Sequence, residues 1–273
     1  MARSRRYART GASGRAAVSP DALVGDLPGV AHPARRWVTP LDRRRADTAF
    51  FETHWHHIIR GSTPAVAEYL HAERQLTGKT LDDDGYHGLI EVGCADGSLL
   101  MPGAIDRGLD YLGVDLAAGA VALARRALAA TSHAGRQRRT AVIQGDVRDL
   151  PTLAGRLPAA PRLVAFPFNV LAGIPTPRDA LRAADSCGGD ILVLTYQTTP
   201  AATEVRRDYY RACGFQGRFR RDRDGVHFTA DLFTSSVYHR DVIVGWLEEL
   251  GYRVEVEPFA AVGLAYHARR RTP

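Results

Sequence analysis

The segment Gly88–Leu100, GLIEVGCADGSLL, constrains the fold of this chain more than any other stretch. Its apolar residues Leu89, Ile90 and Val92 are typical of a buried strand, and the glycine-rich turn Gly93–Gly97 follows at once. Glycine tolerates positive φ angles and lets a ligand approach the backbone closely. We expect Ser98–Leu100 to be the first turn of a helix, whose free N–H groups can meet a polar ligand.

Further apolar runs follow at regular distances along the chain. Tyr111–Val114 ends in Asp115, which lies 18 residues beyond Gly97, and Ala117–Ala130 is a good helix former. A third run, Ala141–Ile143, leads through Gln144 to Gly145 and Asp146. This alternation predicts a parallel sheet with right-handed crossovers and a ligand at the carboxyl ends of its strands. Arg162–Phe166 and Gly189–Tyr196 predict a fourth and a fifth strand.

The pattern Glu91-x-Gly93-x-Ala95-x-Gly97 resembles motif I of the class I (Rossmann-like) S-adenosylmethionine-dependent methyltransferases, with Ala95 where the usual form has glycine. A dinucleotide fingerprint needs G-x-G-x-x-G, which this glycine spacing does not fit. The resemblance, to the small-molecule type, covers about residues 88–268. It implies an α/β fold: a seven-stranded, mostly parallel sheet with helices on both faces, an N-terminal helical lid and a small acceptor-side insertion. Two runs, Tyr252–Val256 and Val262–His267, resemble the antiparallel hairpin that closes this sheet.

The same resemblance implies S-adenosyl-L-methionine as cofactor and S-adenosyl-L-homocysteine as product. Asp115 would accept hydrogen bonds from the ribose hydroxyls, Asp146 would contact the adenine amino group, and Val147 would contact the ring through its backbone. An aspartate that merely ends a strand is the alternative for Asp115, and a cap or turn role is an equal alternative for Asn169. The cofactor-binding residues we predict are Glu91, Gly93, Ala95, Gly97, Asp115, Leu116, Asp146, Val147, Phe166 and Asn169.

The acceptor side is less constrained. Ala165–Phe168 (AFPF) lacks the polar first residue of the Asn/Asp-Pro-Pro-aromatic motif, which argues against methylation of a base amino group. A hydroxyl acceptor needs a general base, whereas an amine needs only desolvation. The catalytic candidates are His239, His227 and Tyr209, with Asp231 and the histidines at 54, 56 and 57 as further bases. The substrate candidates are Trp55, Phe168, Tyr210 and Tyr238. Each of these side chains has a structural role as its alternative, and no metal site is expected.

The net charge of +6 comes from one end of the chain. Residues 1–45 hold ten Arg and three Asp, so the remainder is close to neutral. We expect a basic, disordered tail over 1–45, a helical lid over 46–80 and the methyltransferase domain over 81–273, with the acceptor-side insertion at 204–238. Apolar spacing from Phe50 to Ile59 and the N-cap pair Thr63-Pro64 predict two helices in the lid. Gly217–Asp224 reads as a basic, turn-rich loop.

These patterns predict a methyltransferase that acts on a small-molecule acceptor. The Arg- and Ala-rich composition indicates a GC-rich bacterial genome, and with the acceptor-side insertion it fits a bacterial biosynthetic pathway. Three scattered cysteines without an apolar leader or span suggest the cytoplasm. We expect no membrane partner, a homodimer is compatible with the sequence, and nucleic acid is the less favoured partner. The alternatives are an RNA methyltransferase that uses the basic tail and a non-methylating S-adenosylmethionine-binding protein of the same fold.

Overall fold

The computed structural model describes residues 50–56, 63–131, 139–230 and 233–271, all within one compact unit. The predicted tail over 1–45 and the middle of the predicted lid, 57–62, lie outside the described residues. Residues 50–56 are helical, as the apolar spacing predicts. No helix in the described part of the chain has the length and apolarity needed to cross a membrane.

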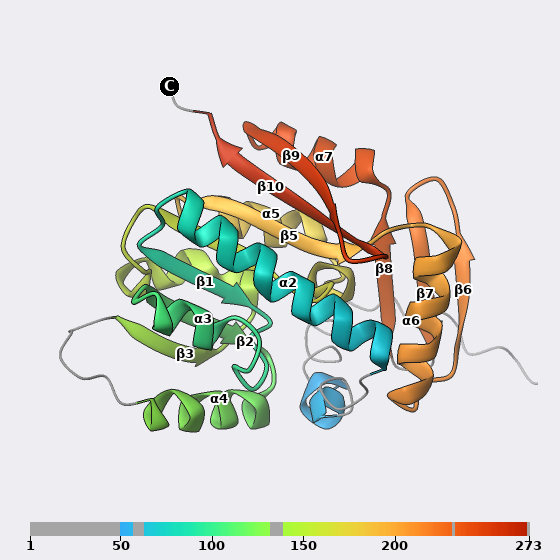
Figure 1. Cartoon of the computed structure of the whole chain (residues 1–273), viewed down its shortest axis with the longest axis horizontal. Coiled ribbons are helices and arrows are strands. Elements are labelled where there is room, and N and C mark those ends of the chain that lie inside the picture. Colours follow the sequence, from blue (N-terminus) through green and yellow to red (C-terminus); the bar gives the residue numbers. More distant parts are fainter. Residues whose placement is uncertain (1–49, 57–62, 132–138, 231–232, 272–273) are drawn as a thin grey trace, which may run out of the picture. The chain divides into compact units, whose positions relative to one another are not determined.

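A seven-stranded sheet forms the centre of this unit (Figure 1). Its strand order is β3-β2-β1-β4-β5-β10-β9, and the first five strands in this order pair in parallel. β10 is antiparallel to both β5 and β9, which confirms the predicted closing hairpin. The strand bounds are Gly88–Val92 (β1), Asp110–Asp115 (β2), Thr140–Gln144 (β3), Arg162–Phe166 (β4), Asp190–Tyr196 (β5), Tyr252–Phe259 (β9) and Gly263–Arg270 (β10).

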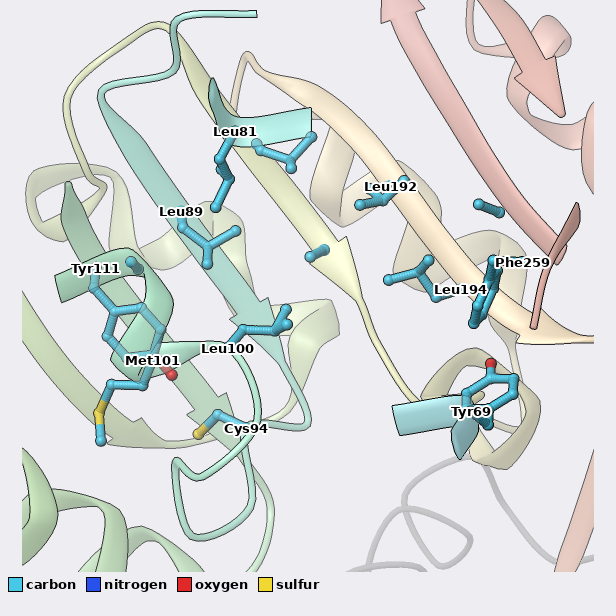
Figure 2. Packing of buried hydrophobic residues seen from close by; sticks show 14 of the residues in the cluster. Tyr69, Leu81, Leu89, Cys94, Leu100, Met101, Tyr111, Leu192, Leu194 and Phe259 are labelled. Carbon is cyan, nitrogen blue, oxygen red and sulfur yellow. The ribbon is translucent and has the colours of Figure 1, made fainter. Parts of the chain in front are cut away.

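Helices cover both faces of this sheet, which confirms the predicted fold class. One face packs Leu89 and Leu192 against α2, α3 and α4, and Figure 2 shows this core. The other face packs Ile90 and Val164 against η1, α5 and α7, because successive residues of a strand point to opposite faces. The helices are α2 (Pro64–Asp83), α3 (Met101–Asp106), α4 (Ala118–Ala130), α5 (Pro177–Asp185), α6 (Pro200–Ala212) and α7 (Arg240–Glu249), with 3-10 helices η1 (Val147–Arg156) and η2 (Val170–Gly173).

The first residues of α2 and α3 show how local sequence sets the helix starts. The Thr63 side chain accepts a hydrogen bond from the Val66 N–H, and a proline occupies the first turn, as predicted. α2 runs past the predicted lid boundary and buries Tyr69 and Leu81 in the core. The expected helix start at Ser98–Leu100 is wrong, because those residues form a bend and α3 begins at Met101.

A second, three-stranded antiparallel sheet follows α6 in the chain. It comprises β6 (Gly217–Arg221), β7 (Gly225–Ala230) and β8 (Thr234–Tyr238), in that order. The prediction of a loop at Gly217–Asp224 is therefore wrong over its first five residues. β6 is an edge strand whose Phe219 packs 5.0 Å, centroid to centroid, from Phe228, while its arginines stay exposed. Exposed charges on an edge strand resemble a solvated loop in sequence.

Candidate functional site

The turn after β1 has the backbone geometry that its glycines suggest. Gly93 has φ +70°, and a Cβ atom there would lie 2.4 Å from Cγ2 of Val170. Gly97 has φ +77°, and its added Cβ would lie 2.6 Å from Cε of Met101. Ala95, at the position where motif I usually has glycine, also has a positive φ of 48°. The turn therefore requires glycine at 93 and holds Ala95 in a strained conformation.

Glu91 supports this turn from inside the core. Its fully buried carboxylate accepts hydrogen bonds from the Tyr111 hydroxyl at 2.6 Å and from the Leu100 N–H at 3.4 Å. Burial raises the pKa of Glu91 to about 8, although both hydrogen bonds act in the opposite direction. Glu91 lines neither of the cavities described below, so the predicted direct contact with a ligand is not what the structure shows. Gly97 and Phe166, which were also predicted to bind the cofactor, line neither cavity, and Phe166 is a core residue.

Asp115 ends β2 beside the turn. One carboxylate oxygen accepts the Ala95 N–H at 2.9 Å and the other accepts the Ala117 N–H at 2.8 Å. Burial raises the pKa of Asp115, while these two amides favour its ionised form. Each oxygen of a carboxylate has two acceptor sites, so Asp115 keeps capacity for two further donors. It lines both of the cavities at this edge of the sheet.

The smaller cavity, of about 80 Å³, lies at the carboxyl ends of β1, β2 and β3. Leu116, Val147 and Ile174 give it apolar walls. Asp146 also lines it, but its carboxylate caps η1 through the Arg148 N–H and pairs with the Arg148 guanidinium, whose Nε lies 2.8 Å from Oδ1. Any adenine amino group at this place would therefore have to share the Asp146 carboxylate with Arg148.

The larger cavity, of about 230 Å³, adjoins the smaller one, since Phe51, Gly93 and Asp115 line both. Its wall is mostly apolar, carries eight aromatic rings and is assembled from distant parts of the chain. The rings are Phe51, Trp55, Phe168, Tyr196, Tyr209, Tyr210, Phe215 and Phe233. Polar groups on the same wall include Arg74, Asp96, Asn169 and Ser235.

The helical residues 50–56 connect the two cavities. The Glu52 carboxylate accepts the Ala118 N–H at the start of α4 at 2.7 Å and the Gln144 side-chain amide at 3.1 Å. Phe50 stacks on Phe233, with ring centroids 5.1 Å apart. These contacts hold the segment between the ends of β2 and β3 and the aromatic wall.

The exit from β4 forms another part of the larger cavity. Phe168 and Asn169 have positive φ angles of 44° and 58°. The buried Glu73 carboxylate accepts the Phe168 N–H at 2.5 Å, and burial raises the pKa of Glu73 well above its usual range. Thr195 donates to the Asn169 side-chain oxygen at 2.5 Å. Because the Asn169 side-chain oxygen accepts this bond, its amide N–H groups can act as donors on the cavity wall.

Three predicted catalytic or substrate residues lie away from both cavities. His227 lies between Asp222 and Ser236, His239 contacts the Thr198 hydroxyl at 2.9 Å, and Tyr238 packs on Trp246. Ser235 faces the cavity from β8, so Tyr238, three residues on, points to the other face. Neither imidazole is therefore positioned to contact a ligand in these cavities.

The further candidate bases His54 and His56 also line neither cavity, and His57 and Asp231 lie outside the described residues. The remaining predicted residues lie on the cavity walls. Gly93, Ala95, Asp115 and Asn169 line the larger cavity together with Trp55, Phe168, Tyr209 and Tyr210, and Leu116, Asp146 and Val147 line the smaller one. The cavity also has wall residues that the sequence does not predict: Phe51, Arg74, Tyr196, Phe215, Phe233 and Ser235. No local pattern marks them, because only the tertiary fold brings them together.

No protein-family model matches this sequence, and no curated protein sequence matches it significantly. Solved structures do match. The PH0226 protein of Pyrococcus horikoshii OT3 superposes with a TM-score of 0.54 at 13% identity, over 77% of this chain and 93% of that one. Magnesium protoporphyrin IX methyltransferase from Synechocystis PCC 6803, solved with S-adenosylhomocysteine, gives 0.53 at 16% identity, over 84% and 100% of the two chains.

This chain has the class I methyltransferase fold. The Synechocystis enzyme solved with S-adenosylmethionine also matches, with a TM-score of 0.50 at 15% identity over 82% of this chain and 97% of that one. In this chain, the class I methyltransferase fold brings the glycine turn, Asp115 and Asp146 to one edge of the sheet, where the two cavities meet.

Proposed function

We propose that this protein is an S-adenosylmethionine-dependent methyltransferase with a small-molecule acceptor. The observation that carries the proposal is the Asp115 carboxylate, which has free acceptor capacity and lies where the two cavities join. The fold supports the same function. A role in bacterial secondary metabolism is part of the proposal, supported by the Arg- and Ala-rich composition and by the insertion at 204–238.

The residues of the two cavities fit this cofactor. Asp115 has the acceptor sites that two ribose hydroxyls need. Leu116 and Val147 offer apolar surfaces to a planar base, and Gly93 allows close approach to the backbone. The larger cavity continues from Asp115 past Ala95 and Asp96, which leaves room for an amino-acid end. When bound, S-adenosylmethionine supplies an electrophilic methyl group.

The chain itself mainly positions the acceptor and excludes water. The aromatic wall removes water from one side of the larger cavity, and holding two reactants together can contribute about 7 to 11 kcal/mol. The Asn169 amide can donate a hydrogen bond at the β4 exit. No described histidine lines this cavity, so its walls suit an acceptor that needs no imidazole base.

Calorimetric titration with S-adenosylmethionine and S-adenosylhomocysteine tests the cofactor. We expect micromolar binding that weakens at least tenfold, or about 1.4 kcal/mol, in Asp115→Ala. Asp106→Ala is the matched control, because this exposed aspartate ends α3 away from both cavities. Failure of both ligands to bind the wild-type protein would overturn the proposal.

The size of the acceptor can be tested separately. A cavity of about 230 Å³ with a mostly apolar wall suits a small molecule better than a polynucleotide. We expect RNA to bind weakly at physiological salt. Tight RNA binding that falls steeply with salt would replace the small-molecule acceptor with RNA.

A further inference from the structure

A fully buried arginine lies behind the wall of the larger cavity. Arg206, on α6, donates from Nη1 to the Val226 carbonyl at 3.1 Å and from Nη2 to the Ser235 carbonyl at 3.0 Å. Its guanidinium carbon lies 5.8 Å from the Tyr210 ring centroid and 5.3 Å from that of Phe219. Its hydrogen-bond partners in the described part of the chain are two carbonyls and one hydroxyl, and no carboxylate there pairs with it. A buried cation without a countercharge is costly, so a nearby anion would be strongly favoured.

Two hydroxyl groups connect this charge to the cavity. The Ser235 hydroxyl lies 3.4 Å from Arg206 Nη2 and 2.7 Å from the Tyr210 hydroxyl. Both Ser235 and Tyr210 line the larger cavity, although Ser235 is only 2% exposed and Tyr210 only 5%. Arg206 is thus separated from the cavity by a single layer of side chains.

The number of hydroxyl hydrogens shows that this pair has a donor to spare. The guanidinium can only donate, so it takes one acceptor site of Ser235 and supplies none. The mutual hydrogen bond between Ser235 and Tyr210 uses one of their two hydroxyl hydrogens. Whichever group donates in that bond, one O–H remains without an acceptor among the described residues. It lies on the cavity wall beside a buried positive charge.

The rings near this O–H define the rest of the ligand. Tyr210 packs against Phe233 at 5.7 Å between centroids, and Phe233 lies 5.5 Å from Phe215; all three line the cavity. The two carboxylates of the cavity, Asp96 and Asp115, belong to the glycine turn and the end of β2 instead. The aromatic part of the cavity therefore combines apolar faces with a donor and a cation.

From this arrangement we propose that the larger cavity selects an aromatic anion as the methyl acceptor, with its anionic oxygen at the Ser235–Tyr210 pair in front of Arg206. That the bound anion is the methyl acceptor rests on the proposed function. The selection of an anion by the cavity does not depend on it. The class of acceptor is a planar aromatic compound bearing a carboxylate or phenolate oxygen.

Calorimetry with two probes of matched shape tests the charge. We would titrate 2-naphthoate and its neutral analogue 2-naphthamide into the wild-type protein, with and without saturating S-adenosylhomocysteine. We expect naphthoate to bind at least tenfold more tightly than the amide, a difference of about 1.4 kcal/mol. Equal binding of the two probes, tighter binding of the amide, or binding of neither at millimolar concentration would overturn the inference.

Variants assign the preference to Arg206. In Arg206→Met we expect the ratio between the probes to fall below threefold. The double variant Ser235→Ala/Tyr210→Phe removes both hydroxyls but retains the charge, and we expect it to lose most of the preference as well. It carries the test if Arg206→Met does not fold. Arg211→Gln removes an exposed arginine from the same helix and should leave the ratio unchanged. A tenfold preference that survives in the folded variants would contradict the assignment.

The same titrations separate this inference from the proposed function. Binding of S-adenosylhomocysteine without a preference between the probes would overturn the anionic acceptor and leave the methyltransferase proposal intact. A clear preference for naphthoate in a protein that binds no S-adenosylhomocysteine would do the reverse.

Discussion

The two cavities are built in different ways. The donor end, which we define as the walls formed by Gly93, Asp115 and Val147, consists of backbone and strand ends that follow one another in the chain. The acceptor lobe, defined as the walls formed by Tyr210, Phe215 and Phe233, consists of side chains from the α6–β8 region. The donor end depends on the central sheet, whereas the acceptor lobe depends on packing within a region beside it.

This difference predicts which properties a substitution in each region will change. A change in the donor end alters the loop after β1, which β2 and η2 also contact, so it should affect both stability and cofactor binding. A change in the acceptor lobe should affect the acceptor and leave the cofactor site intact. The variants below test that separation, from the largest expected effect to the smallest.

The largest combined effect, on stability and cofactor binding together, is expected for Gly93→Ala. The new Cβ would meet Val170 at 2.4 Å in a backbone conformation that alanine avoids. We expect the free energy of unfolding to fall by about 3 kcal/mol and the affinity for S-adenosylhomocysteine to fall at least tenfold. Chemical denaturation and calorimetry measure the two effects. Gly155→Ala, where an added Cβ meets nothing within 4 Å, is the control, and unchanged cofactor affinity in Gly93→Ala would contradict the comparison.

A pH-dependent effect is expected at Glu91, under the donor end. The pKa of Glu91 is about 8 in the folded protein against a usual value of 4.5, so between these values the folded state binds a proton that the unfolded state has released. The contribution of Glu91 to stability is therefore present below pH 4.5 and is lost as the pH rises toward 8, by up to about 1.4 kcal/mol per pH unit. Glu91→Gln should lack this loss. Parallel curves of unfolding free energy against pH for the two proteins would contradict the prediction.

A more local effect is expected for Phe233→Ala in the acceptor lobe. Phe233 is partly exposed and contributes one ring to the cavity wall, so its removal deletes apolar contact with the ligand. We expect the affinity for 2-naphthoate to fall about tenfold, or 1.4 kcal/mol. The affinity for S-adenosylhomocysteine should change less than twofold. A parallel loss of both affinities would show that the two regions do not act separately.

The smallest effect is expected for Ala95→Gly, and its sign is opposite. Ala95 has a φ of 48°, which costs a residue with a Cβ atom about 1 to 2 kcal/mol. Glycine relieves that strain, although it adds flexibility to the unfolded chain. We therefore expect a gain of about 1 kcal/mol in the free energy of unfolding, with little change in cofactor affinity. Thermal denaturation would refute the strain argument if the variant were less stable than the wild type.

The same division explains what could be predicted from sequence. The strands, the glycine turn and the positions of Asp115 and Asp146 follow from apolar runs and turn residues that are contiguous in the chain. The internal partners of Glu91 and Asp146 could not be predicted, because Tyr111 and Arg148 look ordinary in sequence and act only through their positions in the fold.

The walls of the larger cavity were harder to predict than the donor end. Phe51 and Phe233 meet in one wall although most of the chain separates them. Tyr238 was predicted as a substrate residue and points away, because the face of β8 that meets the cavity depends on strand register. β6 was not predicted as a strand, because its arginines are exposed. An edge strand of this kind lacks the regular alternation of buried and exposed residues that marks a strand in sequence.

The hydrogen bonds of Arg206 have a consequence for how such proteins diversify. All the partners that Arg206 contacts, from Tyr210 to Ser235, lie in the single stretch between β5 and α7. The residues that contact the cation therefore all belong to one continuous segment of the chain. Under the proposal above, moving that segment onto another sheet of this architecture should transfer the preference for an anionic ligand in one step, whereas point mutations would have to rebuild it residue by residue.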